Sequence, residues 1–234
     1  MQYCSRSVSG QKEPIHPNLE ATVQKHLANP FLRPIQDYNE SAMDSARQQW
    51  QQLGEPSIIL DSGCGIGEST RNLSNKYPEH LVIGIDQSQH RLAKSGLEQS
   101  YFLQGNMLLV RADLIDCWRI LVRENWLPEK HYILYPNPWP KKKHLQRRWH
   151  GHPVFKSILQ LGGELELRSN WKTYVDEFAF ALRVANPIIP SGSSAPKETQ
   201  GHNPREFLTP FEKKYALSKQ PLYRLHTSMA DFNH

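Results

Sequence analysis

Ser57-Ile58-Ile59-Leu60 runs directly into Asp61-Ser62-Gly63-Cys64-Gly65-Ile66-Gly67-Glu68-Ser69, and this stretch decides the fold. The apolar run predicts a short buried strand, and the pattern from Thr70 to Lys76 predicts a helix. A strand that turns through closely spaced glycines into a helix brings the backbone and the helix N-terminus close to a ligand. Taken alone, the G-x-G-x-G spacing is a weak signal.

A second buried strand is predicted at Leu81-Val82-Ile83-Gly84-Ile85, and Asp86 ends it about twenty residues after the glycines. A carboxylate in that place can accept both hydroxyls of a ribose, which a dinucleotide-binding enzyme would share. The pattern D-x-G-x-G-x-G, however, resembles the first two motifs of class I S-adenosylmethionine (SAM) dependent methyltransferases. The resemblance implies that Asp61 lies near the methionine end of SAM, that the glycines border the cofactor, and that Asp86 holds the ribose.

The third strand has two open assignments. In the preferred one, Tyr101–Gly105 is the strand, and Asn106 and Met107 lie at its carboxyl end beside the adenine. The residues after Met107 then form one amphipathic helix with Asp113 on its surface. In the alternative, Leu108–Ala112 is the strand and Asp113 is its end residue.

The stretch Tyr135-Pro136-Asn137-Pro138-Trp139-Pro140 follows a short buried strand at His131–Tyr135. Three prolines in the five positions after Tyr135 prevent a ladder or helix from continuing, so the strand ends in a rigid loop. Asn137 lies between two prolines and is held in one conformation with its side chain presented. A planar base can stack on Trp139 while the amide of Asn137 reads its polar edge.

A basic run follows this loop. Between Lys141 and Arg148 there are five Lys or Arg residues and no acid, a local field suited to RNA phosphates. A solvated basic face is the alternative interpretation. The histidines His144, His150 and His152 are not expected to bind a metal, because no carboxylate or cysteine lies nearby at ligand spacing.

The composition suits a soluble α/β protein. Of 234 residues, 38% are hydrophobic and 22% charged, and the formal net charge is +5. No run approaches the roughly 20 apolar residues of a membrane span, and the N-terminus lacks a signal-peptide core, so a cytoplasmic protein is expected. Cys4, Cys64 and Cys117 are expected to be free thiols.

The chain is predicted to divide into an N-terminal arm with helices, residues 1–53, and a methyltransferase domain, residues 54–234. Composition predicts a mobile loop at about 186–204. The other predicted elements are helices at about 18–29, 41–53, 154–161 and 170–182, a strand at 164–169, a terminal segment at 208–214 and an antiparallel edge strand at 221–225.

Several ordered motifs resemble the bacterial tRNA (guanine-N7)-methyltransferase family. The hallmark F-x-D-P-W-x-K-x-R-H-x-K-R-R is matched by Tyr135 to Arg148, and L-x-L-G-G is matched by Leu159 to Gly163. T-D-W-x-x-Y is matched by Ser169 to Tyr174, and the C-terminal T-x-F-E is matched by Thr209 to Glu212. Together with the glycine motif, these matches cover most of the chain.

The resemblance implies a class I methyltransferase Rossmann-like fold: a seven-stranded, mostly parallel sheet with helices on both faces and an antiparallel C-terminal strand. It implies SAM as the cofactor, tRNA as the partner, and methyl transfer to guanine N7 in the tRNA variable loop by a monomer or homodimer. The expected catalytic residues are Asn137 and Trp139. The expected cofactor-binding residues are Asp61, Gly63, Gly65, Gly67, Asp86, Asn106 and Met107. The expected tRNA-binding residues are Lys141, His144, Arg147, Arg148, Asn170, Thr209 and Glu212.

The chain departs from this family where carboxylates are usual. Asn137 and Asn170 replace the aspartates of D-P-W and T-D-W, and Asn106 replaces the third-strand acid in the preferred assignment. An amide carries no charge to stabilise the cationic product of N7 methylation, and it matches adenine better than guanine. Two alternatives therefore stand beside N7 methylation: methylation of another substrate, such as an exocyclic amine of a nucleobase, and a non-catalytic RNA-binding paralogue.

Overall fold

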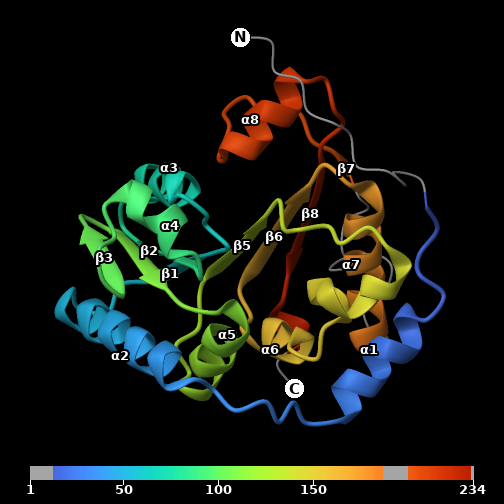
Figure 1. Ribbon diagram of the computed structural model, residues 1–234, viewed down its shortest axis with the longest axis horizontal. Coiled ribbons are helices and arrows are strands. Elements are labelled where there is room, and N and C mark those ends of the chain that lie inside the picture. Colours follow the sequence, from blue (N-terminus) through green and yellow to red (C-terminus); the bar gives the residue numbers. More distant parts are fainter. Residues whose placement is uncertain (1–12, 187–199, 233–234) are drawn as a thin grey trace. The chain divides into compact units, whose positions relative to one another are not determined.

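The computed structural model describes residues 13–186 and 200–232, which belong to two compact units (Figure 1). One unit holds residues 33–134. The other combines the residues up to Leu32 with those from Tyr135 onward. The predicted division at residue 53 stays a prediction, and most of the predicted mobile loop lies outside the described residues.

The unit of residues 33–134 is built on five strands in the order β3-β4-β2-β1-β5. All neighbouring pairs are parallel except β3 and β4, which are antiparallel. The strands are β1 (Ile58–Ser62), β2 (Leu81–Asp86), β3 (Tyr101–Gln104), β4 (Met107–Arg111) and β5 (Lys130–Leu134). Every residue of β1 and β2 is buried, as expected of parallel strands covered on both faces.

Helices cover both faces of this sheet. In Figure 1, α3 (Glu68–Lys76) and α4 (Gln89–Leu92) lie on one face, and α2 (Asp37–Gln52) and α5 (Leu114–Arg123) lie on the other. A short 3₁₀ turn, η1 (Ala93–Ser95), follows α4. Gly84 of β2 permits the close approach of α3, because a Cβ there would collide with Oγ1 of Thr70.

The preferred assignment of the third parallel strand is wrong. Met107–Arg111 is the strand that pairs in parallel with β2, and Tyr101–Gln104 is an antiparallel strand outside it. Asn106 lies in the turn between the two, at the amino end of β4, and Asp113 follows its carboxyl end. Both candidate segments are strands because Gly105 adopts a positive φ of 58° and allows a tight hairpin.

The other unit contains three strands in the order β6-β8-β7, all antiparallel: β6 (Glu164–Ser169), β8 (Tyr223–Ser228) and β7 (Gln200–Gly201). The antiparallel C-terminal strand is confirmed, but it is not an edge strand, because β7 pairs along its outer side. The described residues thus hold eight strands, one more than the seven expected. The helices are α1 (Leu19–Ala28), α6 (Phe155–Gln160), α7 (Lys172–Ala185) and α8 (Pro210–Leu217), with 3₁₀ turns η2 (Lys142–Arg147), η3 (Trp149–Gly151) and η4 (Ala230–Phe232).

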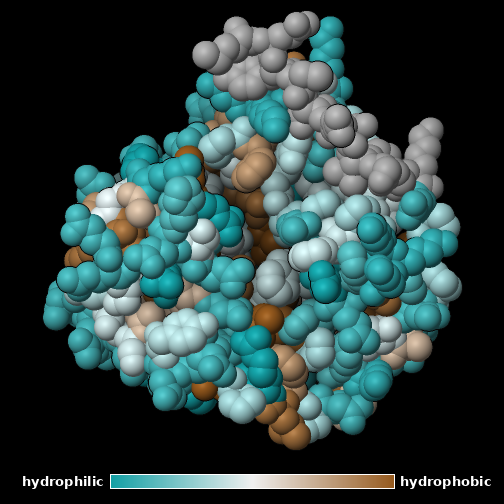
Figure 2. All heavy atoms as spheres, viewed as in Figure 1, coloured by the Kyte–Doolittle hydropathy of each residue, from teal (hydrophilic) through white to brown (hydrophobic). Residues whose placement is uncertain are grey.

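The surface agrees with the composition. On the face shown in Figure 2, hydrophilic side chains predominate and hydrophobic ones occur in small groups. Among the described residues, no helix combines the length and the apolar character needed to cross a membrane.

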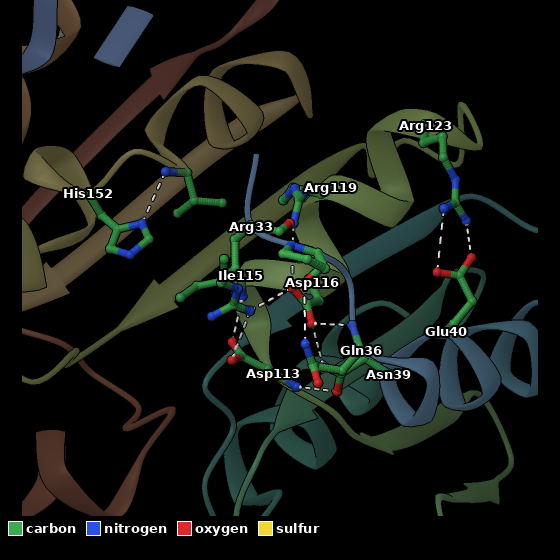
Figure 3. A network of polar contacts seen from close by, with 12 residues as sticks. Arg33, Gln36, Asn39, Glu40, Asp113, Ile115, Asp116, Arg119, Arg123 and His152 are labelled. Atoms are coloured by element: carbon green, nitrogen blue, oxygen red, sulfur yellow. Dashed lines mark hydrogen bonds and ion pairs between the residues drawn. The ribbon is translucent and has the colours of Figure 1, made fainter. Parts of the chain in front are cut away.

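A network of polar contacts ties the start of α2 to the turn between β4 and α5 (Figure 3). Asn39 is fully buried; its Nδ2 donates to Asp116 Oδ2 at 2.6 Å, and its Oδ1 accepts from the Asp113 backbone N–H at 2.9 Å. Arg33 donates to Asp116 Oδ1 at 2.6 Å and to Asp113 Oδ2 at 3.2 Å. Burial alone would raise the pKa of Asp116, but hydrogen bonds from Arg33, Gln36 and Asn39 outweigh it and lower the pKa.

We expect Asn39→Ala to lower the free energy of unfolding by about 2 kcal/mol, because it removes one of the two hydrogen bonds to the buried Asp116 Oδ2 and takes away the partner of the Asp113 backbone N–H. Urea unfolding followed by circular dichroism measures this. Glu40→Ala is the matched control on the same helix, since the Glu40–Arg123 ion pair is partly exposed and should contribute less than about 1 kcal/mol. Equal losses in the two variants would contradict the assignment.

Candidate functional site

The glycine turn between β1 and α3 leaves open space beside the backbone. Gly63, Gly65 and Gly67 have φ of 83°, 62° and 75°, a left-handed conformation that residues with a Cβ rarely adopt. Nothing lies within 4 Å of a Cβ built at Gly65, and only a Leu114 methyl, at 3.9 Å, approaches one at Gly63. The turn is anchored by backbone N–H donation from Gly63 and Cys64 to Ile85 O. A ligand can therefore approach the backbone closely here.

Asp86 ends β2 beside this turn. Its Oδ2 accepts from the Gly65 backbone N–H at 3.0 Å, and its Oδ1 accepts from the Ser88 backbone N–H at 2.8 Å. The carboxylate is 3% exposed and also forms an ion pair with Arg91 at 3.0 Å. Each carboxylate oxygen can accept a further hydrogen bond. A carboxylate fixed beside an open glycine turn fits a ligand that bears a ribose. Such a ligand would compete with Arg91 for Asp86 Oδ1.

Asp61 lies inside the unit, in β1. Its Oδ2 accepts from the hydroxyls of Ser69 at 2.6 Å and Thr70 at 2.8 Å, both in the first turn of α3. Burial raises the pKa of Asp61 to about 6. The hydrogen bonds from the two hydroxyls lower this pKa, and the nearby Asp86 charge raises it. In this geometry the visible role of Asp61 is to fasten α3 to β1, and so to hold the glycine turn.

Asn106 and Met107 do not share this edge of the sheet with Asp86. Asn106 Nδ2 lies within 3.2 Å of three backbone carbonyls, those of Ser74, Tyr77 and His80, which places it at the amino end of β4. Met107 is 2% exposed and packs in a core cluster with Cys64, Leu92, Leu97 and Leu109. Neither is a candidate for cofactor binding.

Arg111 ends β4 beside Asp86, and Ala112 and Asp113 follow it. Arg111 pairs with Asp86 in register, and the Ala112 N–H donates to Asp86 O at 3.3 Å. Asp113 is the N-cap of α5, because its Oδ1 accepts from the Ile115 N–H at 2.8 Å. The alternative assignment, in which Leu108–Ala112 is the strand, identified Asp113 as its end residue.

A buried hydrogen-bonded group in β1 and β5 was missed from sequence. Ser62 Oγ lies 2.8 Å from His131 Nε2 and accepts from Trp118 Nε1 at 3.0 Å. Burial lowers the pKa of His131 to about 3, so the ring is neutral near pH 7. The group fixes the carboxyl end of β1, where the glycine turn starts.

In the other unit, the loop Tyr135–Pro140 is conformationally strained at two positions. Tyr135 has φ 52° and Trp139 has φ 47°, and neither residue is glycine. The start is held by Tyr135, whose N–H donates to Arg168 O at 2.8 Å and whose hydroxyl donates to Glu212 Oε1 at 2.9 Å. Asn137 is exposed, as predicted from the flanking prolines, and its Oδ1 accepts from the Trp139 N–H at 3.4 Å.

Trp139 is already stacked within the protein. The guanidinium carbon of Arg147 lies 4.7 Å from the Trp139 ring centroid, and His144 packs edge-on at 5.4 Å. Burial and the neighbouring cations lower the pKa of His144, which disfavours its charged form. Lys141, Lys142, Lys143 and Arg147 are the exposed cations of this run and remain candidates for phosphate binding.

Arg148 does not belong with them. Its side chain is 2% exposed and forms an ion pair with Glu177, which is also buried. It donates to Trp139 O at 3.3 and 3.2 Å and to Pro140 O at 3.3 Å, and its guanidinium lies 4.8 Å from the Trp171 ring centroid. Arg148 therefore holds the strained end of the loop, and the prediction that it contacts tRNA is wrong for this structure.

Glu177 is the shared anion of this group. It also accepts from the His16 backbone N–H at 3.1 Å and lies 2.9 Å from His150 Nε2. Burial would raise the pKa of Glu177, but His150 and Arg148 outweigh it and lower the pKa. No sequence signal identified Glu177, because it is an ordinary position of α7 that tertiary packing buries. Within the described residues, no three His, Cys, Asp or Glu side chains form a metal-binding group.

The T-x-F-E motif forms the N-terminal cap of α8. Thr209 Oγ1 accepts from the Glu212 N–H at 2.9 Å, and Glu212 is fully buried. The Glu212 carboxylate accepts from Arg168 and from the Leu208 N–H, both at 2.8 Å, and from Tyr135. Asn170 follows β6, is 5% exposed and donates to Gln220 Oε1 at 3.0 Å. These three predicted tRNA-binding residues are buried, and among them Glu212 contacts the loop through Tyr135.

The chain is similar to methyltransferases in sequence. A family model described as a putative methyltransferase matches residues 55–225. The tRNA (guanine-N(7)-)-methyltransferase of Limosilactobacillus reuteri is 28% identical over 214 residues, which are 86% of this chain and 95% of the relative. The enzyme of the same name from Cupriavidus pinatubonensis is 26% identical over 162 residues, which are 67% of this chain and only 61% of the relative.

Solved structures support the fold. A structure titled as an antibiotic-related methyltransferase has a TM-score of 0.54 and 13% identity, and the match covers 74% of this chain and 87% of that one. The 16S rRNA methyltransferase KamB has a TM-score of 0.51 and 15% identity, with 77% and 92% covered. The predicted class I methyltransferase fold is confirmed by these neighbours.

Substitution of the adjacent residues Arg147 and Arg148 tests whether Arg148 stabilises the fold while Arg147 is a surface residue. We expect Arg148→Ala to lower the free energy of unfolding by about 3 kcal/mol, because it leaves the buried Glu177 short of its main counterion. Arg147→Ala, the matched control, should cost less than about 1 kcal/mol, the value of an exposed cation–π contact. Denaturant unfolding of both variants measures the difference. A stable Arg148→Ala variant with weakened RNA binding would support the tRNA contact that the sequence predicts for Arg148.

Glu212 should make the free energy of unfolding decrease at low pH. Burial opposes ionisation, but His202, Arg168 and the Leu208 N–H outweigh it and lower the pKa of Glu212 from 4.5 to about 2. A lowered carboxylate pKa stabilises the fold above pH 4.5, and this contribution is lost as the pH falls from 4.5 toward 2. Glu212→Gln should therefore cost on the order of 3 kcal/mol at pH 7 and progressively less below pH 4.5.

Unfolding curves of wild type and Glu212→Gln at several pH values measure this difference. The exposed Glu206 provides the control, and Glu206→Gln should leave the curves nearly unchanged at every pH. A pH-independent cost of Glu212→Gln would show that its charge is not what stabilises the fold.

Proposed function

We propose that the chain transfers a methyl group from SAM to guanine N7 in the variable loop of tRNA. It belongs to the family described as putative methyltransferases, since the family model matches residues 55–225, most of its length. The relatives of 26 and 28% identity are named tRNA (guanine-N(7)-)-methyltransferases, which supports tRNA and guanine N7 as the substrate and target. The observation that supports a cofactor role in this chain is the fixed Asp86 carboxylate beside the open turn at Gly65.

Residues of the unit 33–134 would hold SAM, which supplies the electrophilic methyl group. The glycine turn would border the cofactor, and Asp86 would accept from the ribose hydroxyls in place of Arg91. Asp61 would act through Ser69 and Thr70 by holding the turn. Asp113, which follows β4, would take the cofactor-binding role expected of Asn106.

Residues of the other unit would hold the RNA. Asn137 is the exposed polar group of the loop and would read the edge of the base, and the exposed lysines with Arg147 would bind phosphates. Guanine N7 carries a free lone pair, so methyl transfer is a direct displacement that needs positioning and no general base. The Asn137 amide can orient the base but supplies no negative charge to the cationic product.

A second candidate reaction is favoured by one observation, the amide at position 137. An amide offers a donor and an acceptor side by side, which matches adenine. Asn-Pro-Trp-Pro also resembles the motif of methyltransferases that modify exocyclic amines, in which an asparagine accepts from the amine. A non-catalytic RNA-binding protein is the third candidate, and it would have no need of the Asp86 and Gly65 geometry.

A nucleoside inventory separates the three. Unmodified tRNA transcripts and total RNA are incubated with the protein and isotopically labelled SAM, and digested nucleosides are analysed by mass spectrometry. Label in 7-methylguanosine is the expected result. Label in another methylated nucleoside would select the second candidate. The third would be selected if no nucleoside is labelled and calorimetry also detects no SAM binding.

Asn137→Asp should raise transfer to N7 by about tenfold or more, because it restores an anion where positive charge develops. The measurement is the initial rate of label incorporation into 7-methylguanosine. Asp86→Ala is the companion variant and should abolish SAM binding while RNA binding persists. A rate for Asn137→Asp that is unchanged or lower would indicate that the pocket no longer holds guanine.

A further inference from the structure

A row of aromatic rings extends from the loop onto α8. Phe211 and Tyr215 of α8 are nearly parallel, with ring centroids 6.3 Å apart and planes inclined by 26°. Tyr215 in turn lies 5.7 Å from Tyr135, the first residue of the loop that carries Asn137 and Trp139. We call Phe211, Tyr215 and Tyr135 the aromatic row. All three belong to the same compact unit.

The outer end of the row is open. Phe211 is 53% exposed, whereas Tyr215 and Tyr135 are half-buried. Phe211 is four residues before Tyr215, so the two rings lie on one side of the helix and support each other. Burial in a core does not explain Phe211, because more than half of its surface reaches solvent.

The exposed charged residues of α8 and of the turn after it are lysines. Lys213 and Lys214 of α8 and Lys219 just after it are exposed. The one acid between residues 207 and 222 is Glu212, which is buried and paired with Arg168. Within residues 207–222, the exposed side therefore presents an aromatic ring and cations, and the nearest exposed acid along the chain is Glu206. An aromatic ring beside cations complements a polyanion that carries planar groups.

We propose that the aromatic row is a binding site for a single-stranded segment of RNA, with one base stacked on Phe211 and phosphates bound by Lys213 and Lys214. That the RNA is the methyl-accepting tRNA rests on the proposed function. Because the row starts at Tyr135, the stacked nucleotide belongs to the unpaired stretch that flanks the target base. Duplex RNA is disfavoured, since its bases do not offer their faces to a side chain.

Fluorescence anisotropy with a labelled, unmodified tRNA transcript tests the site without SAM. Phe211→Ala should weaken binding roughly 5- to 100-fold, the range for loss of one stacked base. Phe211→Trp should retain affinity. Leu217→Ala is the matched control, because Leu217 is a 49% exposed apolar residue of the same helix outside the row, and it should bind like wild type.

The lysines are tested by salt. Lys213→Gln with Lys214→Gln should flatten the dependence of log affinity on log salt concentration by about 0.7 for each phosphate that the variant no longer neutralises. A short single-stranded RNA should compete with tRNA for wild type and compete less well for Phe211→Ala, and the same strand in a duplex should not compete at this site.

Two results would overturn the site: Phe211→Ala that binds tRNA like wild type, or Leu217→Ala that loses as much affinity as Phe211→Ala. If wild type methylates tRNA and Phe211→Ala binds normally, the site fails while the proposed function stands. If wild type binds tRNA through Phe211 but labels no nucleoside, the site stands while the proposed function fails. Normal circular dichroism of Phe211→Ala confirms that the variant is folded.

Discussion

Neutralisation of buried charge is the constraint on which the loop Tyr135–Pro140 depends. Two of its residues, Tyr135 and Trp139, adopt left-handed backbone conformations that cost on the order of 1 to 3 kcal/mol each. Such strain persists only where surrounding structure imposes it. At the start of the loop, the Tyr135 hydroxyl donates to Glu212, which pairs with buried Arg168. At its end, the carbonyls of Trp139 and Pro140 accept from buried Arg148, and Arg148 pairs with Glu177. Each ion pair is fully compensated, so the loop is fixed at both ends and presents Asn137 between them.

The same principle organises the unit of residues 33–134, where the buried Asp116 accepts from Arg33, Gln36 and Asn39. This network orders the turn that follows β4, and Asp113 in that turn caps α5. The Asp86 carboxylate, by contrast, is oriented by two backbone N–H groups and shares an oxygen with the half-exposed Arg91. Fixed orientation with a replaceable partner is what a ligand-binding carboxylate requires, whereas Asp116 and Glu212 have their places filled by the protein itself.

This distinction bears on the chemistry. The carboxylate of the T-x-F-E motif is occupied by Arg168 and by backbone donors, and asparagines stand at positions 137 and 170. On the proposed function, a transition state that develops positive charge on guanine would gain less from these side chains than from aspartates at positions 137 and 170. On the proposed function, positioning would carry more of the catalysis, through the rigid loop and the Trp139–Arg147 stack.

The sequence by itself determined β1, β2 and β5, the glycine turn, Asp86 at the end of β2 and the exposed Asn137, because period, proline and glycine act locally. It did not determine which of two apolar segments pairs with β2, since both are strands and only sheet register places Asp113, and not Asn106, beside Asp86. Nor did it separate Arg147 from Arg148, neighbours of identical type. Only the tertiary structure decided that one is exposed and the other buried against Glu177, because burial is set by residues about thirty positions away in the chain.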